Sequence, residues 1–224
     1  MSSVDANDYP AVTIGFVGHP SMFAWGWIEQ KKGVYTWTAF DKFVANARVH
    51  NVDIMLTFGK TPSWAVKNQS SCESKYGRTL CNAAPDNLDD WKEFVTQIAT
   101  HYKGQVKYYE LWNEASSREF WQGTIPELVK MSSVAYPIIK SIDPNAIVLT
   151  PSVTGPVGNA PFSASVWMTQ YLQAGGNRYA DGGTFHGYIA VTGTHPYPMP
   201  EQDSTSCTKI IDCYSSIITK VKTM

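Results

Sequence analysis

The segment that decides the fold reads Val106-Lys107-Tyr108-Tyr109-Glu110-Leu111-Trp112-Asn113-Glu114. Its apolar and aromatic residues predict a strand over Val106–Trp112 that runs directly into an Asn-Glu pair. Alternate side chains of a strand share a face, so Glu110, Trp112 and Glu114 are predicted to point the same way. Glu114 would then stand at the carboxyl end of the strand, with Glu110 deeper inside.

Outward from this strand, short apolar runs alternate with longer amphipathic ones. Strands are predicted at Val12–Val17, Val52–Phe58, Val106–Trp112, Ala146–Thr150 and His186–Val191. Helices are predicted at Thr38–His50, Leu88–Tyr102, Ile125–Lys140, Ser163–Gln173 and Ser204–Val221. Asp86 or Asn87 can cap the second helix, Thr124 can cap the third, and Gly175-Gly176 ends the fourth.

Five successive β/α units predict a parallel sheet that is covered by helices on its outer face. An open doubly wound sheet and a closed barrel both fit this alternation. No GxGxxG or GxxxxGK[ST] loop follows any of the strands, which removes the commonest reason for the open form. We therefore expect an α/β fold of the TIM (β/α)8-barrel type, with no linker to suggest a second domain.

Charge and hydropathy exclude some partners. The formal net charge of the 224 residues is −1, and Lys and Arg are scattered, so we expect no nucleic acid and no anionic membrane as partner. No apolar run approaches the roughly 18 residues that span a bilayer. The N-terminal residues show no signal peptide, so we expect either that one was removed or that the chain begins inside a longer one.

Four cysteines form two local pairs, Cys72 with Cys81 and Cys207 with Cys213. Neither pair has the spacing of a zinc site, and no metal or cofactor site is predicted. Four cysteines allow three connectivities, and local pairing needs the least rearrangement, which favours two short disulfides and an oxidising compartment. The alternative is four free buried thiols. Asn68-Gln69-Ser70 is a glycosylation acceptor sequence of a kind that is common by chance.

The Asn113-Glu114 pair suggests acid/base chemistry on a sugar. A glycosidase needs a carboxylic acid beside the glycosidic oxygen, and a neighbouring amide can bind a sugar hydroxyl. The alternative for a Glu after a strand is a carboxylate at a helix N-terminus. Aromatic residues make up 13% of the chain, and they are either sugar platforms or ordinary core packing. The aromatic residues that flank Glu114 and its position at the end of a strand favour the catalytic role over the helix N-terminal one.

Five motifs occur in the order and at the spacing of successive barrel strands. They are Trp27-Ile28-Glu29 with Gly33-Val34-Tyr35-Thr36-Trp37, Leu56 to Ala65, Glu110 to Glu114 with Phe120 to Thr124, Leu149 to Ser152, and Thr194-His195-Pro196-Tyr197-Pro198. With these motifs, almost the whole chain resembles the clan A glycoside hydrolases, especially the group around families 39 and 5. One departure is Ala115, where that group usually has Pro after Asn-Glu.

The resemblance implies roles for individual residues. Glu114 becomes the general acid/base, and Asn113 becomes its sugar-binding neighbour. Further substrate-binding residues implied by the motifs are His195, Tyr197, Trp64 and Trp121, with Tyr197 near the nucleophile. Each has a structural alternative, because Trp64 can close the barrel rim and His195 can shape a turn before Pro196.

The resemblance also makes the five predicted strands numbers two to six of a barrel. We therefore expect residues 1–224 to be a single glycoside hydrolase catalytic domain, truncated at the C-terminus and with a missing or degenerate first strand. The nucleophile, a Glu on strand seven, is expected beyond residue 224. The implied activity is that of a secreted retaining glycosidase acting on a polysaccharide or oligosaccharide, with two carboxyl groups and no cofactor.

Two other functions fit the same residues less well. A non-hydrolytic carbohydrate-binding remnant would keep the aromatic platforms and lack the nucleophile. Another barrel enzyme, such as an aldolase or isomerase, would need a Schiff-base lysine or a metal cluster at the strand ends. Lys60 is the one strand-end lysine in the sequence, which gives this second alternative thin support.

Overall fold

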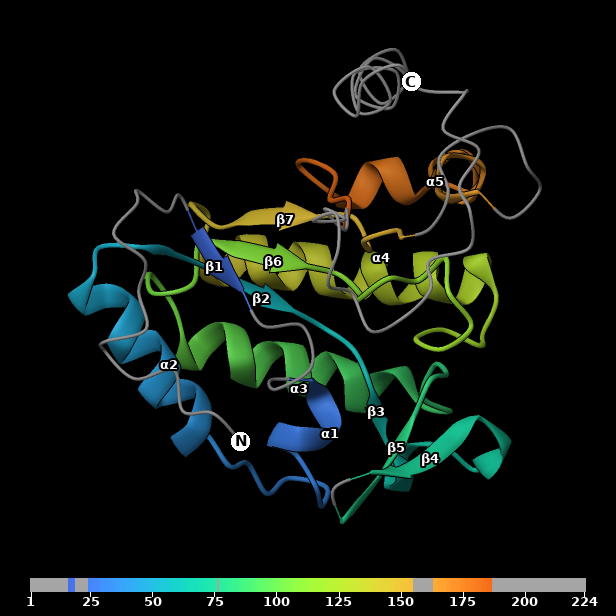
Figure 1. The fold of residues 1–224 in the computed structure, drawn as a ribbon, viewed down its shortest axis with the longest axis horizontal. Coiled ribbons are helices and arrows are strands. Elements are labelled where there is room, and N and C mark those ends of the chain that lie inside the picture. The colour runs from blue at the N-terminus through green and yellow to red at the C-terminus, as the bar shows by residue number, and fades with distance from the viewer. Residues whose placement is uncertain (1–15, 19–23, 76, 155–162, 187–224) are drawn as a thin grey trace, which may run out of the picture.

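A computed structural model describes residues 16–18, 24–75, 77–154 and 163–186 of the chain. Its main sheet has four strands in the order β1-β2-β6-β7, and every neighbouring pair is parallel (Figure 1). The strands are β1 (Phe16–Gly18), β2 (Asp53–Thr57), β6 (Tyr108–Glu110) and β7 (Ile147–Leu149). The long helices between and after them are α2 (Thr38–Val49), α3 (Leu88–His101), α4 (Ile125–Ile142) and α5 (Ala164–Gln173). The predicted alternation of parallel strands and helices is confirmed.

Side chains at the helix N-termini explain where three of these helices begin. Asn87 accepts a hydrogen bond from the backbone N–H of Asp89 at the start of α3. Thr124 and Glu127 form a reciprocal capping box at the start of α4, and Ser163 caps α5. Each cap satisfies backbone donors that have no partner inside the helix. Local sequence therefore determines these boundaries.

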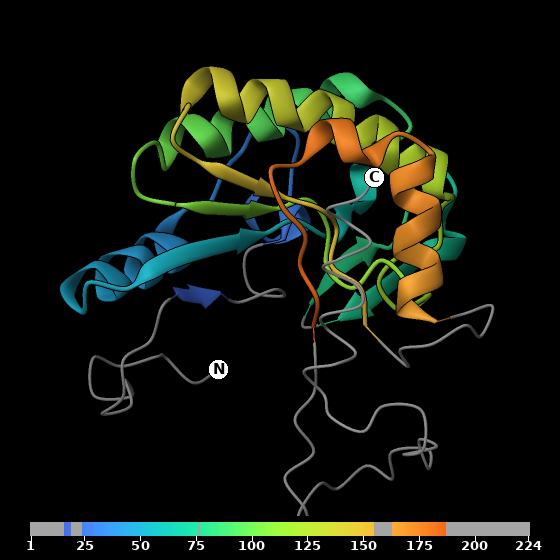
Figure 2. The ribbon, with the colours of Figure 1, turned by 90° about the horizontal axis from the view of Figure 1, so that it is seen from above.

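The main core lies between the sheet and the helices, and it is rich in aromatic side chains. Figure 2 shows α3 and α4 together on one side of the main sheet. Trp25 stacks on Phe94 with ring centroids 5.2 Å apart, and Phe58 meets Trp91 edge to face at 5.0 Å. The indole N–H of Trp91 donates to the carbonyl oxygen of Met131, which ties α3 to α4. These rings therefore serve core packing.

A second, antiparallel sheet follows β2 and was not predicted. It has the order β3-β5-β4, with β3 at Thr61–Pro62, β4 at Cys72–Lys75 and β5 at Arg78–Cys81. We call these three strands the outer sheet. Short helical turns accompany the strands, namely α1 (Trp25–Ile28), η1 (Ser63–Ala65), η2 (Gln69–Ser71) and, after α5, η3 (Gly176–Tyr179).

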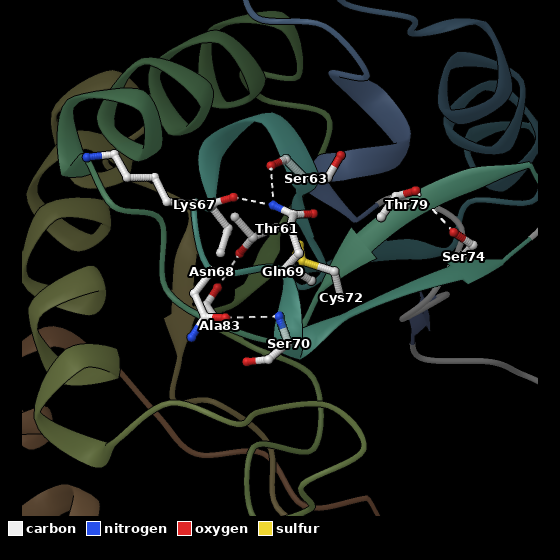
Figure 3. The surroundings of a disulfide bond; sticks show 12 residues. Thr61, Ser63, Lys67, Asn68, Gln69, Ser70, Cys72, Ser74, Thr79 and Ala83 are labelled. Carbon is white, nitrogen blue, oxygen red and sulfur yellow. Dashed lines mark hydrogen bonds between the residues drawn. A yellow bond between two sulfur atoms is a disulfide. The ribbon is translucent and has the colours of Figure 1, made fainter.

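A disulfide joins the outer sheet's two hairpin strands. Cys72 and Cys81 are directly paired across β4 and β5 and bonded through their sulfur atoms (Figure 3). The predicted bond between them is confirmed, whereas Cys207 and Cys213 lie outside the described residues. Asn68 of the glycosylation acceptor sequence is exposed, and its side chain accepts a hydrogen bond from the Ser70 N–H.

Of the strand predicted at His186–Val191, His186 alone lies within the described residues. Parallel bridges join Leu149 to Gly182 and Val153 to Phe185, so pairing beside β7 occurs before His186. Residues 187–224, including the predicted helix Ser204–Val221, lie outside the described part of the chain. Among the helices that the structure describes, none is long and apolar enough to cross a membrane.

Candidate active site

The candidate site lies at the carboxyl end of β6. The strand ends at Glu110, two residues before the predicted end at Trp112. In the parallel register Glu110 pairs with Thr57 of β2 and with Leu149 of β7, so these three residues form one row across the sheet. Glu110 is fully buried. The chain then turns through residues 111–114 and brings Glu114 beyond the strand end.

The backbone of Glu114 is held in an uncommon conformation. Its φ of 42° lies in the left-handed region, which costs a non-glycine residue roughly 1–3 kcal/mol and recurs at functional sites. Hydrogen bonds to Ser152 hold it there. The Glu114 N–H donates to Ser152 Oγ at 2.8 Å, and the Ala115 N–H donates to the Ser152 carbonyl at 2.9 Å. Ser152 donates in turn from its N–H to the Trp112 carbonyl at 2.8 Å.

His186 connects the two carboxylates of this segment. Its Nδ1 lies 3.1 Å from Oε1 of Glu114, and its Nε2 lies 3.3 Å from Oε2 of Glu110. Burial by itself lowers the pKa of His186, but the contacts with Glu110 and Glu114 outweigh it and raise that pKa to about 9. The ring is therefore cationic near neutral pH and balances buried negative charge.

Asn113 has a side-chain oxygen that receives no hydrogen bond from the described part of the chain. Its backbone N–H donates to the Phe58 carbonyl at 2.9 Å, which fixes the residue between β6 and β2. The residue is only 7% exposed, and no described residue donates a hydrogen bond to its Oδ1. A buried oxygen without a donor costs free energy.

The two predicted aromatic platforms differ in exposure. Trp64 is partly buried, meets Trp25 edge to face at 5.9 Å, and donates from its indole N–H to the Glu29 carbonyl. Trp121 is only 3% exposed and packs edge to face on Trp112 at 5.1 Å. The Trp121 ring is therefore largely covered by packing, and its role as a sugar platform stays a prediction.

Lys60 forms an ion pair with the outer sheet. Its backbone has a φ of 51°, and its ammonium lies 2.6 Å from Oε1 of Glu73 and 5.5 Å from the centre of the Phe120 ring. This ion pair gives no support to a Schiff-base role, which needs an uncharged amine. Among the described residues, no group of three or more His, Cys, Asp and Glu could hold a metal ion.

Sequence reasoning missed His186 and Ser152, and it named two residues that cannot be located. His195 and Tyr197 lie outside the described residues. The His-x-Tyr spacing that pointed to them also occurs earlier, at His186-Gly187-Tyr188. That earlier copy begins directly after the bridge at Phe185, so the same spacing also points to His186.

Comparison with known proteins bears on this arrangement. The family model "Glycosyl hydrolase family 10" matches residues 12–135, which is more than half of the chain. A search among curated protein sequences gave no match.

Solved structures give the fold. A family 39 glycoside hydrolase from Bacteroides cellulosilyticus WH2 matches with a TM-score of 0.57 and 18% identity, over 79% of this chain and 33% of that one. A xylanase from Paenibacillus barcinonensis matches with a TM-score of 0.60 and 15% identity, over 93% and 59%. A family 10 xylanase from Thermobacillus composti matches with a TM-score of 0.59 and 17% identity, over 83% and 54%.

The chain thus spans less than two thirds of each of these structures. At such identities the likeness establishes the fold, and the described residues form part of a TIM (β/α)8-type barrel, as predicted. The predicted clan of glycoside hydrolases is confirmed as well. By the match over residues 12–135, the chain belongs to glycosyl hydrolase family 10.

Proposed function

We propose that the protein is a secreted retaining glycoside hydrolase that cleaves a polysaccharide of the xylan type, with Glu114 as general acid/base. The observation that carries this proposal is the setting of Glu114 at the carboxyl end of β6. The residue is nearly buried, held in a left-handed conformation by Ser152, and in contact with a cationic His186. Carboxyl ends of barrel strands are where active sites of this fold occur.

The proposed reaction has two steps that use the same carboxyl group. In the first, Glu114 gives its proton to the glycosidic oxygen while a second carboxylate bonds to the anomeric carbon and the glycosidic bond breaks. In the second, Glu114 takes a proton from water, whose oxygen displaces that carboxylate. Asn113 fits the part of a sugar-binding neighbour, because it directly precedes Glu114 beyond the carboxyl end of β6.

The second carboxylate must be another residue than Glu110. Glu110 has no exposed surface, so it cannot reach an anomeric carbon. We propose a Glu on a later strand of the barrel, one or two β/α units past His195. His195, Tyr197 and the partly exposed Trp64 remain proposed substrate-binding residues. Xylan is chosen because several of the similar structures are described as xylanases.

A substitution at Glu114 tests the proposal on the protein expressed from its complete reading frame. Glu114→Gln keeps the shape of the side chain and removes its acid, so hydrolysis of soluble xylan should fall by roughly 10²–10⁴-fold. A nitrophenyl xylobioside should lose far less in the bond-breaking step, because its leaving group needs no proton.

The matched control is Glu119→Gln, which makes the same change at an exposed residue of the following loop and should leave activity unchanged. Equal activity of the Glu114 and Glu119 variants would contradict the assignment of Glu114. Binding of xylo-oligosaccharides by the wild-type protein without any turnover would instead favour a carbohydrate-binding role.

A further inference from the structure

His186 stands between two buried acidic side chains. Glu110 is fully buried, the side chain of Glu114 is 8% exposed, and that of His186 is 20% exposed. Among the described residues, these two carboxylates are the charged groups that face the imidazole ring. The ring comes from the segment that pairs beside β7, so three neighbouring barrel units meet at this point.

Glu110 depends on His186 for its charge balance. Neither of its carboxylate oxygens receives a hydrogen bond of good geometry from a described residue, and the Nε2 contact at 3.3 Å is its ion pair. Burying a carboxylate without a cationic neighbour costs free energy. The contact with Glu110 is therefore favourable, and it orients the imidazole ring of His186. With Nε2 turned to Glu110, Nδ1 is directed to Glu114.

The number of protons on the three side chains matters for catalysis. A neutral imidazole donates from one nitrogen, whereas an imidazolium donates from both. As an imidazolium, His186 carries a proton on each ring nitrogen, so Nε2 faces Glu110 and Nδ1 faces Oε1 of Glu114 at 3.1 Å. The proton that Glu114 transfers is then a separate one, carried by its other carboxyl oxygen.

We propose that His186 is a positioning residue for the acid/base step, holding Oε1 of Glu114 through Nδ1 while Glu110 orients its ring through Nε2. The inference rests on the proposed function, since it takes Glu114 as the proton donor. Oε2 then becomes the oxygen of Glu114 that meets the glycosidic oxygen. When Glu114 has given up its proton, the cationic ring faces the new carboxylate and compensates its charge.

Two substitutions separate the two contacts of the ring. The amide nitrogen of Asn can take the place of Nδ1, and that of Gln can take the place of Nε2. His186→Asn should therefore keep the contact with Glu114 and retain kcat within a few-fold. His186→Gln should lose it, and kcat on soluble xylan should fall roughly 10–100-fold with little change in KM.

The pH profile adds a readout that packing alone would not move. A cation beside a carboxyl favours its ionised form, and both variants remove that cation. The alkaline limb of kcat/KM should therefore move to higher pH in both variants. Equal kcat values for the two variants, or an unmoved alkaline limb, would overturn the proposal.

A measurement on the wild-type protein covers the case in which a variant does not fold. Nitrogen NMR of the histidine side chains should show both ring nitrogens of His186 protonated at neutral pH. Glu110→Gln should lower the pKa of His186 by removing its buried counter-charge. A neutral ring at neutral pH in the wild type would contradict the proposal.

The role of Glu114 and the role of His186 can be tested separately. Full activity of Glu114→Gln would remove the proposed function and this inference with it. An inactive Glu114→Gln, together with His186 variants that keep the wild-type kcat and pH profile, would remove only the role of His186.

Discussion

We expect the disulfide of the outer sheet to stabilise the protein by an amount that depends on the length of the loop that it closes. The perturbation is the double substitution Cys72→Ser with Cys81→Ser. The two cysteines are nine residues apart in the sequence. In the chain-entropy treatment, closing a loop of this size removes freedom from the unfolded chain that is equivalent to about 2.5 kcal/mol.

The loss of stability should extend beyond the hairpin, because the outer sheet is hydrogen-bonded to the loop that follows Glu114. The Gln122 N–H donates to the carbonyl of Asn82, directly after Cys81, and Thr61 of β3 donates to the carbonyl of Ala83. If the sheet unfolds together with the barrel, about 2.5 kcal/mol corresponds to a fall in Tm of roughly 5–10 °C.

Thermal unfolding of the oxidised wild type and the double variant, at the same pH, measures this fall. Substitution is preferable to reduction, since a reductant would also break the predicted Cys207–Cys213 bond. The double substitution at Cys207 and Cys213 is the matched control for that second pair. An unchanged Tm, with unchanged amide hydrogen exchange over residues 72–81, would refute the reasoning.

Three further predictions concern the surroundings of the site. The folded-state pKa of His186 is about 9, above its ordinary 6.5, so its stabilisation is complete below about pH 6.5 and lost as the pH rises through about 9. Wild type should exceed His186→Gln in free energy of unfolding, and this excess should be smaller at pH 10 than at pH 6 by on the order of 1–2 kcal/mol, a size that allows for the exposed fifth of the side chain. Chemical denaturation at both pH values measures it, and an excess that does not change with pH would contradict the prediction. Ser152→Ala leaves the N–H of Glu114 without its acceptor, so stability should fall by about 1–3 kcal/mol and kcat with it, whereas an unchanged kcat would show that Ser152 does not position Glu114. Gly26→Ala would drive a methyl group into the outer sheet and lower stability by about 1–3 kcal/mol. Gly59→Ala is the control, because there is room for a methyl group at that position. Equal melting temperatures of the two variants would contradict the tight packing around Gly26.

Local signals in the sequence were enough for the four long helices that the structure describes and for the strand that carries the site. Thr124 and Glu127 have the spacing of a capping box, and the box forms where the spacing predicts it. The apolar run before Asn113-Glu114 correctly placed β6 and put Glu114 at its carboxyl end. These features depend on residues within one turn or one strand of each other, so a single sequence reveals them.

Features that depend on distant contacts were not predictable in this way. The left-handed conformation of Glu114 is fixed by Ser152, which is 38 residues away. The outer sheet is built from short polar strands such as Cys72–Lys75, which lack the alternation that identifies a strand. The contact of His186 with Glu114 joins residues that are 72 positions apart in the sequence.

The anomeric configuration of the product that Glu114→Gln forms with azide tests the central claim most directly. Azide can attack a glycosyl-enzyme without a general base, so it should restore turnover of a nitrophenyl xylobioside by the variant. The account predicts a glycosyl azide with the configuration of the substrate, because two displacements retain it. An azide product of inverted configuration, or no acceleration by azide, would contradict the role of Glu114 as acid/base of a retaining glycosidase.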